Sequence, residues 1–344
     1  MIIVGKLFDS AKLLYSERKR LVAPLLGFPG VKMAHSSIKL AQQNHEEHFK
    51  VLSLLLGKFK PDIQFVLMDL SVEANALGLN TLFPPNDSAT VMKKHGEFGI
   101  DELNSLRRIK FDSDSRLLGY VKTVELMKRD FPLEVKVGAY VTGPYTLAGL
   151  IVGAEEAGLM AARDPGKLEE ICAFTTERIM KYNRLLLSAG ADAVCVLEPS
   201  GVMLGPSHFE KFSSVNVKKI VELCHDEKSD CIYHVCGNST HLIEKMVDSG
   251  VDGLSLDSKD AGVDLPGVAK NIPENVVVIG NISPTKTIVY GSPEEVKAEV
   301  ETLLDSMDSF PNYILSTGCD LPLETPLENI SAFMEAGRNY VVSL

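Results

Sequence analysis

The amino-acid sequence predicts an α/β protein built as a single (β/α)8 TIM barrel. Short apolar runs rich in β-branched residues alternate with helical stretches, eight such runs are present, and they end in turn-forming or polar residues. Regular alternation of strand and helix indicates a parallel sheet with right-handed crossovers, and eight strands favour a closed barrel. An open doubly wound sheet is the alternative, but no G-x-G-x-x-G motif follows an early strand.

The predicted strands are the short apolar runs, taken in chain order. They are Arg20–Leu26, Ile63–Asp69, Val135–Thr142, Ala193–Glu198, Cys231–Cys236, Val251–Asp257, Val276–Asn281 and Tyr313–Thr317. The helices between them show helical spacing, and several begin at a proline, which suits the first helical turn. They include Pro165–Ala189, Pro206–Cys224, His241–Asp248, Pro293–Asp305 and Pro326–Ala336.

A single domain over residues 1–344 accounts for all eight strands, although the length alone would also allow two domains. The segment Asn80–Arg116 interrupts the alternation, because it contains Pro84-Pro85-Asn86-Asp87 and then mixed polar sequence. We predict an excursion at about 80–116 between the second and third strands, forming a lid or an entrance wall. An inert loop explains the same composition equally well.

Composition excludes several classes of protein. The chain is 45% hydrophobic and 24% charged, which is ordinary for a globular protein, and its net charge of -11 argues against a general nucleic-acid binder. No uncharged apolar run reaches the roughly 18 residues that a membrane helix needs. Lys6, Asp9 and Lys12 interrupt the start, so we find no signal peptide and expect reduced cysteines. We therefore predict a cytoplasmic protein without a nucleic-acid or membrane partner.

Metal-binding side chains follow two of the predicted strands. His234 and Cys236 are two residues apart, so both project to the same face at the strand end. Cys319 follows the last strand. If the two strand ends lie close together, one nitrogen and two sulfurs form a suitable zinc set with a fourth position open. The alternative is core packing, because buried cysteine is common and an H-x-C pair occurs by chance.

Six segments spread over most of the chain carry a resemblance to known proteins. They are Met68–Gly78, Thr142–Ala148, Glu198–Ser200, His234–Asn238, Ser316–Cys319 and Thr325–Ile330. In this order they resemble the uroporphyrinogen decarboxylase superfamily, and most closely its branch of zinc-dependent corrinoid methyltransferases, such as the methylcobamide:coenzyme M methyltransferases. The H-x-C pair with the distal Gly-Cys is the specific part, and the other segments are shared across the superfamily.

This resemblance implies a (β/α)8 barrel, in agreement with the strand count, and zinc held by His234, Cys236 and Cys319. It implies methyl transfer between methylcobamide and a thiol such as coenzyme M. We find no evident cobalamin module, so we expect the methylcobamide to be carried by a partner corrinoid protein that docks over the barrel mouth. The loop Ala23–Gly30 lacks the arginines that uroporphyrinogen decarboxylases use for substrate carboxylates.

Four further residues are candidates for the site. Glu198 and Asp69 are the catalytic candidates; Asp69 matches the decarboxylase aspartate in position, and a carboxylate that bonds loop amides is the alternative for Glu198. Tyr145 and Asn281 are candidates for cofactor contacts, with core packing and a strand-end cap as their alternatives. Asp257 is a turn cap or an outer partner of the metal site.

The direction of transfer stays open. An incoming thiol bound to zinc becomes a thiolate that attacks methyl-Co(III). An O-demethylase type of enzyme would run the other way, passing methyl from a methylated substrate to the Co(I) corrinoid protein. A uroporphyrinogen decarboxylase-like enzyme and a non-catalytic zinc-binding homologue are the remaining alternatives.

Overall fold

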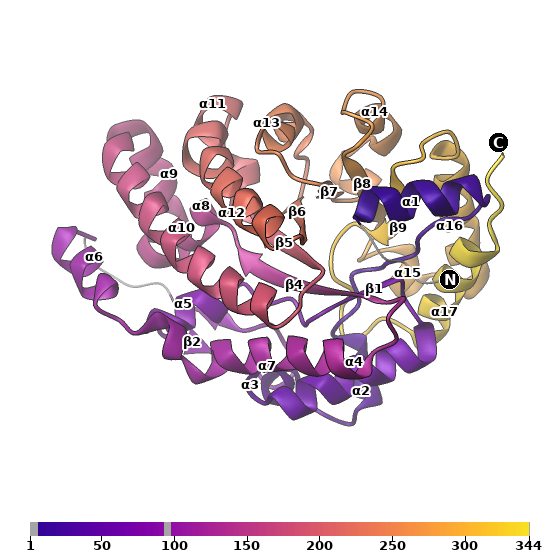
Figure 1. Ribbon diagram of the computed structural model, residues 1–344, viewed down its shortest axis with the longest axis horizontal. Helices are drawn as coiled ribbons and strands as arrows, with labels where there is room; N and C mark the ends of the chain where they lie inside the picture. Colours follow the sequence, from indigo (N-terminus) through magenta and orange to yellow (C-terminus); the bar gives the residue numbers. More distant parts are fainter. Residues whose placement is uncertain (1–5, 93–97, 344) are drawn as a thin grey trace.

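The core of the molecule is a curled sheet of seven parallel strands surrounded by helices (Figure 1). The computed structural model describes residues 6–92 and 98–343. Within this part of the chain, the strand order is β1-β4-β5-β6-β7-β8-β9. The strands are β1 (Ile63–Phe65), β4 (Lys136–Thr142), β5 (Ala193–Leu197), β6 (Asp230–Val235), β7 (Gly253–Leu256), β8 (Val277–Ile282) and β9 (Tyr313–Thr317). The α/β class and the parallel sheet are confirmed.

The prediction of a full strand over Arg20–Leu26 is wrong in its extent. It forms only an isolated parallel bridge between Val22 and Leu315, so the sheet contains seven strands instead of eight. Pro24 has no N–H group and cannot extend the ladder. The next amide, that of Leu25, donates to the side-chain hydroxyl of Thr317.

The helices follow the predicted alternation. They are α1 (Leu7–Ser16), α2 (Pro29–Met33), α3 (Ile38–Gln43), α4 (His45–Phe59), α5 (Val72–Ala76), α7 (Ser115–Asp130), α8 (Pro144–Val152), α9 (Ala154–Arg163), α10 (Pro165–Ser188), α11 (Pro206–Phe209), α12 (Val215–Asp226), α13 (Ile243–Asp248), α14 (Leu265–Ala269), α15 (Thr287–Tyr290), α16 (Pro293–Ser306) and α17 (Leu327–Asn339). Short 3-10 turns are η2 (Pro199–Met203), η4 (Thr240–Leu242) and η5 (Lys259–Ala261). The predicted helix Pro206–Cys224 is interrupted by a π-helical turn, η3 (Glu210–Ser214).

The segment between β1 and α7 has secondary structure of its own. It contains the antiparallel pair β2 (Thr81–Leu82) and β3 (Thr90–Val91), then α6 (Ile100–Arg107) and the 3-10 turn η1 (Phe111–Ser113). Residues 93–97 of the predicted excursion lie outside the described residues. Its role as a lid or wall stays a prediction.

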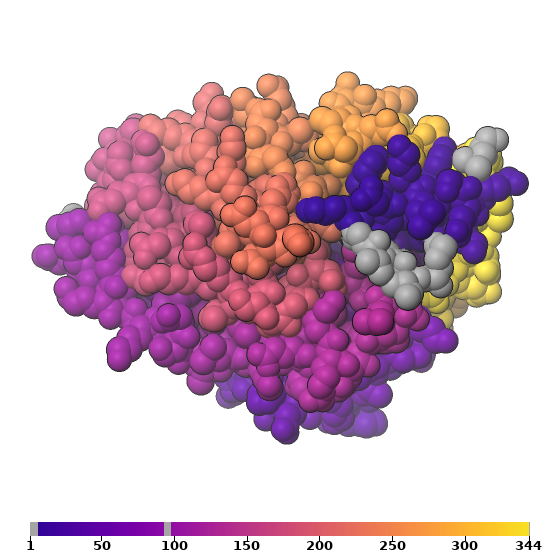
Figure 2. All heavy atoms as spheres, in the orientation of Figure 1, coloured from indigo at the N-terminus to yellow at the C-terminus, as the bar shows by residue number. Residues whose placement is uncertain are grey.

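Helix α1 lies across the amino-terminal ends of the strands. The amide of Leu7 donates to Asp230, the first residue of β6, and Lys6 forms ion pairs with Asp230 and Asp252. Figure 2 shows this helix, in indigo, packed on the surface against the carboxyl-terminal part of the chain. Its position leaves the opposite, carboxyl-terminal end of the strands free of this covering. No helix in the described part of the chain is long and apolar enough to cross a membrane.

A buried carboxyl group, Glu73 of α5, ties this helix to the end of β4. It accepts hydrogen bonds from the backbone amide (2.7 Å) and the hydroxyl (2.9 Å) of Thr142, and burial raises its pKa to about 7. An unfolded glutamate has a pKa near 4.5, so the folded state holds this proton more tightly. The corresponding stability is present below pH 4.5 and is lost as the pH rises through 7.

We expect Glu73→Gln to flatten the dependence of stability on pH. Relative to this variant, the wild-type protein should lose about 3 kcal/mol of its free energy of unfolding between pH 4.5 and pH above 7. Urea unfolding over this pH range measures the effect. The exposed Glu222→Gln serves as the control and should keep the wild-type slope. Equal slopes for Glu73→Gln and the wild type would show that Glu73 titrates normally in the folded protein.

Candidate metal centre

The three predicted metal ligands come together at the carboxyl-terminal end of the sheet. The Nε2 atom of His234 lies 3.1 Å from the Sγ atom of Cys236 and 3.8 Å from that of Cys319. The two Sγ atoms are 3.7 Å apart. Among the described residues, these three form the group of His, Cys, Asp and Glu side chains that could hold a metal ion. His234 is buried and the two cysteines are half-buried, so the group is accessible from one side.

The spacing of the three atoms fits tetrahedral zinc. Zn–S bonds of about 2.3 Å and Zn–N bonds of about 2.0–2.1 Å place two sulfurs about 3.8 Å apart and a nitrogen about 3.6 Å from each sulfur. The observed S–S distance of 3.7 Å and the longer N–S distance of 3.8 Å agree with these values, and the shorter N–S distance is 3.1 Å. One nitrogen and two thiols are also the donor set that selects zinc.

Curvature of the sheet brings the ligands together. His234 lies on β6 and Cys236 just beyond it, whereas Cys319 follows β9, and β7 and β8 lie between these strands. In a flat sheet, three strand spacings would separate the two strands by about 14 Å. Gly318 contributes to the close approach, because a Cβ atom there would lie 2.6 Å from the backbone nitrogen of Ser258.

The imidazole of His234 is oriented by Ser255, a residue that the sequence analysis missed. The Nδ1 atom of His234 lies 2.9 Å from the hydroxyl oxygen of Ser255, and the two residues are register partners on β6 and β7. With Nδ1 bonded to the serine, Nε2 faces the two thiols. A bond of this kind fixes the tautomer and the ring orientation of a metal-binding histidine.

We expect Ser255→Ala to weaken metal binding at this centre by about 10–100-fold, the usual cost of losing an outer hydrogen-bond partner. Competition of the purified protein against a chelator of known affinity measures the change. Ser249→Ala is a matched control, because Ser249 is also buried and donates to a single carbonyl, that of Met246, elsewhere in the fold. Unchanged affinity in Ser255→Ala would mean that the ring is held by packing alone.

Negative and aromatic groups surround the centre. The hydrogen-bonded thiol of Cys236, followed by burial, raises the pKa of Cys319. Burial, followed by the charge of Cys319, raises the pKa of Asp320 well above its ordinary range. Burial raises the pKa of Tyr140 on β4, and the charges of Asp320, Cys195 and Cys319 add to this effect. A bound divalent cation acts in the opposite direction and deprotonates coordinating thiols.

Glu198, a predicted catalytic residue, anchors the start of α8. It is fully buried after β5, and its carboxylate accepts hydrogen bonds from the amides of Tyr145 and Thr146 and from the hydroxyl of Ser213. Gly143 permits this contact, because a Cβ atom there would lie 2.5 Å from the carboxyl carbon. Burial raises the pKa of Glu198. The carboxylate thus binds backbone amides, and these lie in the first turn of α8 instead of in a loop. Ser255 supplies the hydrogen-bond partner of the His234 ring, and a catalytic role for Glu198 stays a prediction.

Asp69, the other catalytic candidate, is held in a buried network. Its Oδ1 atom accepts from the amide and hydroxyl of Ser71, and its Oδ2 atom pairs with Arg116 and accepts from Tyr120. The side chain of Asp69 is only 1% exposed. The guanidinium of Arg116 also lies over the ring of Phe83, 4.7 Å from its centroid. Asp69, which follows β1, therefore holds α7 through Arg116 and Tyr120, and Arg116 in turn contacts Phe83 of the excursion. The catalytic role of Asp69 stays a prediction.

Tyr145 and Asn281, the two residues predicted to contact a cofactor, lie on different elements, α8 and β8. Tyr145 is buried at the start of α8, its ring stacks on Phe212, and burial raises its pKa to about 12. Asn281 donates to the carbonyls of Asp257 and Val263 and lines a cavity of about 680 Å³ beside α14 and α16. Asp257 accepts from the amides of Gly237 and Ser258, as a turn cap does.

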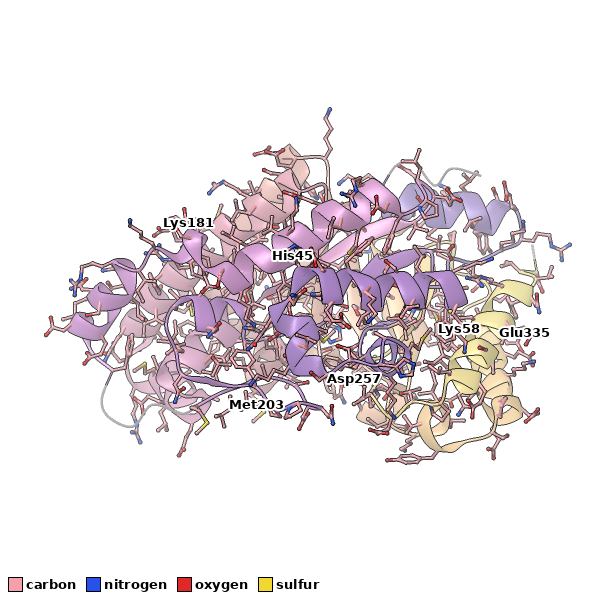
Figure 3. All side chains as sticks on the ribbon, turned by 90° about the horizontal axis from the view of Figure 1, so that it is seen from below. His45, Lys58, Lys181, Met203, Asp257 and Glu335 are labelled. Atoms are coloured by element: carbon pink, nitrogen blue, oxygen red, sulfur yellow. The ribbon has the colours of Figure 1, made fainter. Side chains whose placement is uncertain are left out.

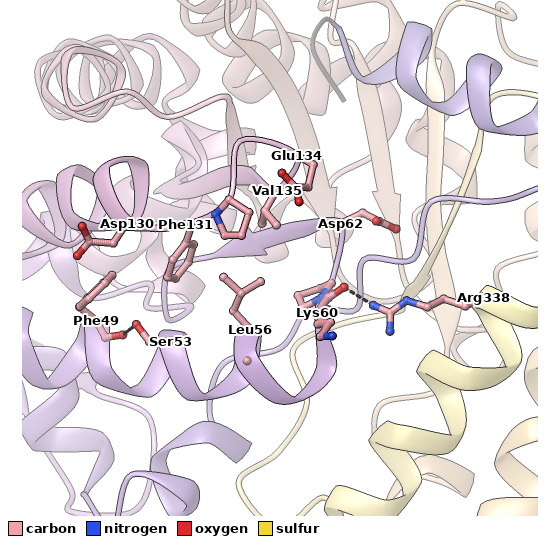
Figure 4. Close-up of a pocket in the computed structure, with 13 residues that line it drawn as sticks. Phe49, Ser53, Leu56, Lys60, Asp62, Asp130, Phe131, Glu134, Val135 and Arg338 are labelled. Atoms are coloured by element: carbon pink, nitrogen blue, oxygen red, sulfur yellow. Dashed lines mark hydrogen bonds between the residues drawn. The ribbon is translucent and has the colours of Figure 1, made fainter. Parts of the chain in front are cut away.

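The opposite end of the sheet carries a separate cavity of about 940 Å³ (Figure 4). Its lining includes Phe49 and Leu56 of α4, Phe131, and Asp62 and Val135, which directly precede β1 and β4. This cavity therefore lies at the amino-terminal ends of the strands. Parallel α/β folds place their chemistry at the carboxyl-terminal ends, where the His234 group lies.

Residues that follow the strands lie toward one side of the molecule. Figure 3 shows Met203, which follows β5, and Asp257, which follows β7, in the same half of the view, with Lys181 of α10 in the other half. Met203 is 83% exposed. An exposed methionine offers a polarizable apolar contact at the same end of the strands as the metal centre.

Comparisons with known proteins identify the family and agree with this fold. The model of the family "Uroporphyrinogen decarboxylase (URO-D)" matches residues 30–340. A methylcobamide:CoM methyltransferase of Methanosarcina mazei is 26% identical over 280 residues, which is 80% of this chain and 79% of the relative. A uroporphyrinogen decarboxylase of Prochlorococcus marinus is 25% identical over 313 residues, 88% of this chain and 87% of the relative. The solved structure of a methyltransferase from Methanosarcina mazei is similar to this structure, with a TM-score of 0.81 at 20% sequence identity. The match covers 97% of this chain and 98% of the methyltransferase.

Proposed function

The chain belongs to the uroporphyrinogen decarboxylase family, and from this premise we propose that it is a zinc-dependent methyltransferase. It moves a methyl group between methylcobamide, carried by a corrinoid protein, and a small-molecule thiol. The observation that carries the proposal is the group formed by His234, Cys236 and Cys319. Its tetrahedral spacing and its half-buried thiols suit a zinc site that takes one further ligand.

His234, Cys236 and Cys319 hold the metal in this proposal, and Ser255 fixes the imidazole. When bound, zinc supplies a Lewis acid that converts an incoming thiol to a thiolate at neutral pH. The sulfur forms a bond to the methyl carbon as the Co–C bond breaks. The methylcobamide of the partner protein would supply the methyl group and be left as Co(I), and the thiol proton would leave to solvent. The half-buried position of the two cysteines lets a thiol approach.

The corrinoid protein docks, in this proposal, at the carboxyl-terminal end of the strands, where Met203 is exposed. We also infer that Leu21–Ala23 closes the sheet into a barrel. Its backbone bonds to Leu315 of β9 on one side, and Val22 accepts from the amide of Asp62, just before β1, on the other. A closed barrel gives the metal centre a single entrance, which suits a partner that delivers a methyl group.

A decarboxylase reaction is the less favoured alternative for this site. The loop 23–30 has no arginine to bind substrate carboxylates, and the carboxylate of Asp69 is engaged by Arg116, Tyr120 and Ser71. The reverse direction of methyl transfer uses the same metal centre. It would differ in the small molecule that reaches the zinc and in the corrinoid, which would arrive as Co(I) and leave methylated.

The test is elemental analysis of the purified protein, followed by titration of its zinc absorption edge with a thiol and with a methyl ether. We expect about one zinc per chain and an edge that changes when the thiol is added. An edge that changes only with the methyl ether would reverse the direction of transfer. A closed, unchanging zinc shell would indicate a non-catalytic zinc-binding homologue, and protein that contains and takes up no zinc would contradict the proposed function.

A further inference from the structure

The cavity between α14 and α16 has no part in the proposed function. Its volume of about 680 Å³ falls within the range of about 300–1,000 Å³ that small-molecule sites occupy. Both helices pack on β8, and the lining of the cavity includes Asn281 and Ile282 at the end of that strand. None of the three residues of the metal centre is among its described lining, so the cavity is a separate place in the fold.

The short length of α14 explains why space is left here. Helix α14 has five residues and α16 has fourteen. At 1.5 Å per residue, a helix of about 8 Å therefore lies beside a helix of about 21 Å and leaves part of its flank uncovered. This flank of α16 faces the cavity with residues at helical spacing, which are Ala298, Glu299, Thr302, Leu303 and Ser306.

The apolar part of the wall is aliphatic. It includes the side chains of Val263, Leu265, Pro266, Ile282 and Leu303, and no aromatic ring is among the described lining residues. The aliphatic body of a ligand would leave water for apolar surroundings in this cavity. Such a transfer favours binding roughly in proportion to the apolar area that is buried.

Several polar groups of the wall already have partners within the protein. The hydroxyl groups of Thr302 and Ser306 donate to carbonyl oxygens of their own helix, α16. The side-chain amide of Asn281 donates to the carbonyl oxygens of Asp257 and Val263. These donors are therefore not waiting for a ligand.

The carboxylate of Glu299 is different. Its Oε2 atom is buried without a hydrogen-bond partner among the described residues, whereas the residue as a whole is half-buried and lines the cavity. A carboxylate oxygen that has left water without gaining a donor carries an uncompensated desolvation cost. A ligand that brings a donor to Glu299 removes this cost.

The charges of the lining favour a positive ligand. Glu299 and the exposed Asp264 contribute two carboxylates, and the exposed Lys259 contributes one ammonium group, so the formal charge of the lining is -1. An ammonium group brings three N–H donors and a positive charge, and hydrogen bonds between ionised groups are the strong ones. A ligand with a carboxylate would instead add a further negative charge beside Glu299.

We propose that this cavity is a binding site for an aliphatic amine. The ammonium group donates to the carboxylate of Glu299, and the aliphatic body lies against Leu265, Ile282 and Leu303. The site is independent of the proposed methyl transfer, because no residue in this argument belongs to the metal centre.

The experiment compares hexylamine, 1-hexanol and hexanoate, which share one hydrocarbon chain and carry positive, zero and negative charge at pH 7. Saturation-transfer NMR titrations of the full chain give the dissociation constants. We expect hexylamine to bind about tenfold more tightly than 1-hexanol, since a hydrogen bond to a charged group contributes about this factor or more, and hexanoate to bind most weakly. In Glu299→Gln, hexylamine should bind about tenfold more weakly, and 1-hexanol should be unaffected.

Glu301→Gln is the matched control, because Glu301 is an exposed glutamate of α16 outside the lining, and it should keep the wild-type values. Ala298→Trp places a large side chain in the cavity from an exposed position of α16 and should abolish the binding of hexylamine.

Three results would overturn the inference. The first is hexylamine that does not bind, or binds no more tightly than 1-hexanol. The second is a Glu299→Gln protein that keeps the wild-type preference for the amine. The third is undiminished binding of hexylamine to Ala298→Trp, which would place the amine elsewhere on the protein. Each of these results leaves the proposed function standing, because zinc content and methyl transfer are measured separately.

Discussion

Cys319→Ser is expected to remove the metal and nearly all methyl transfer. Serine keeps the size of cysteine but offers a hydroxyl instead of the thiolate that zinc prefers. Loss of an outer partner costs about 10–100-fold in metal affinity, so loss of a direct ligand should cost more than about 100-fold. Elemental analysis after dialysis, together with methyl transfer from methylcobamide to a thiol, measures both effects. Cys236→Ser should behave in the same way.

The matched control is Cys172→Ser, which changes a buried thiol in α10 away from the metal centre. It should retain zinc and activity, with at most a modest loss of stability. Far-ultraviolet circular dichroism should show that Cys319→Ser keeps its secondary structure, because the hydrophobic core is extensive. A Cys319→Ser protein with full zinc content and full turnover would show that the ligand assignment is incorrect.

Asp69→Asn is expected to reduce the free energy of unfolding by about 3–5 kcal/mol, because it leaves the charge of Arg116 buried without a counter-charge. The side chains of Asp69 and Arg116 are 1% and 7% exposed. The Nε and Nη1 atoms of Arg116 already lack hydrogen-bond partners among the described residues, so no second acceptor replaces the aspartate. Urea unfolding at pH 7 measures the loss.

Two further variants make this result interpretable. Asp112→Asn, in the exposed turn before α7, should change stability by less than about 0.5 kcal/mol. The double variant Asp69→Asn with Arg116→Met should recover part of the loss, because it removes the uncompensated charge. A loss below about 1 kcal/mol in Asp69→Asn would mean that the pair is not a structural anchor. A folded Asp69→Asn protein without activity would favour the catalytic role instead.

Seven of the eight predicted strands are present because each is a run of apolar, β-branched residues that is buried in the sheet. The remaining predicted strand, Arg20–Leu26, does not form a full strand because Pro24 interrupts its apolar run. The grouping of His234, Cys236 and Cys319 was predictable since the two-residue spacing of His234 and Cys236 fixes a common face and parallel strands end at one edge. Their role as metal ligands stays a prediction. The membership in the uroporphyrinogen decarboxylase family is confirmed as well.

Other parts of the site depend on register and long-range packing, which the sequence does not reveal. Ser255 meets His234 only because β6 and β7 pair in one particular register. Arg116 lies 47 positions after Asp69, at the beginning of α7. The pattern of predicted strands does not show that this helix start meets Asp69. The carboxyl group of Asp320 meets the amides of Gly27 and Leu321 only in the folded chain.

The two cysteines of the metal centre are 83 positions apart, and two strands separate the elements that carry them. An unfolded chain rarely brings the three side chains together, so a zinc ion held as we propose would bind the native state more tightly than the unfolded chain. By mass action, a ligand present at 100 times its dissociation constant adds about 2.7 kcal/mol to the native state. The thermal midpoint of this protein should consequently follow the concentration of free zinc in its surroundings.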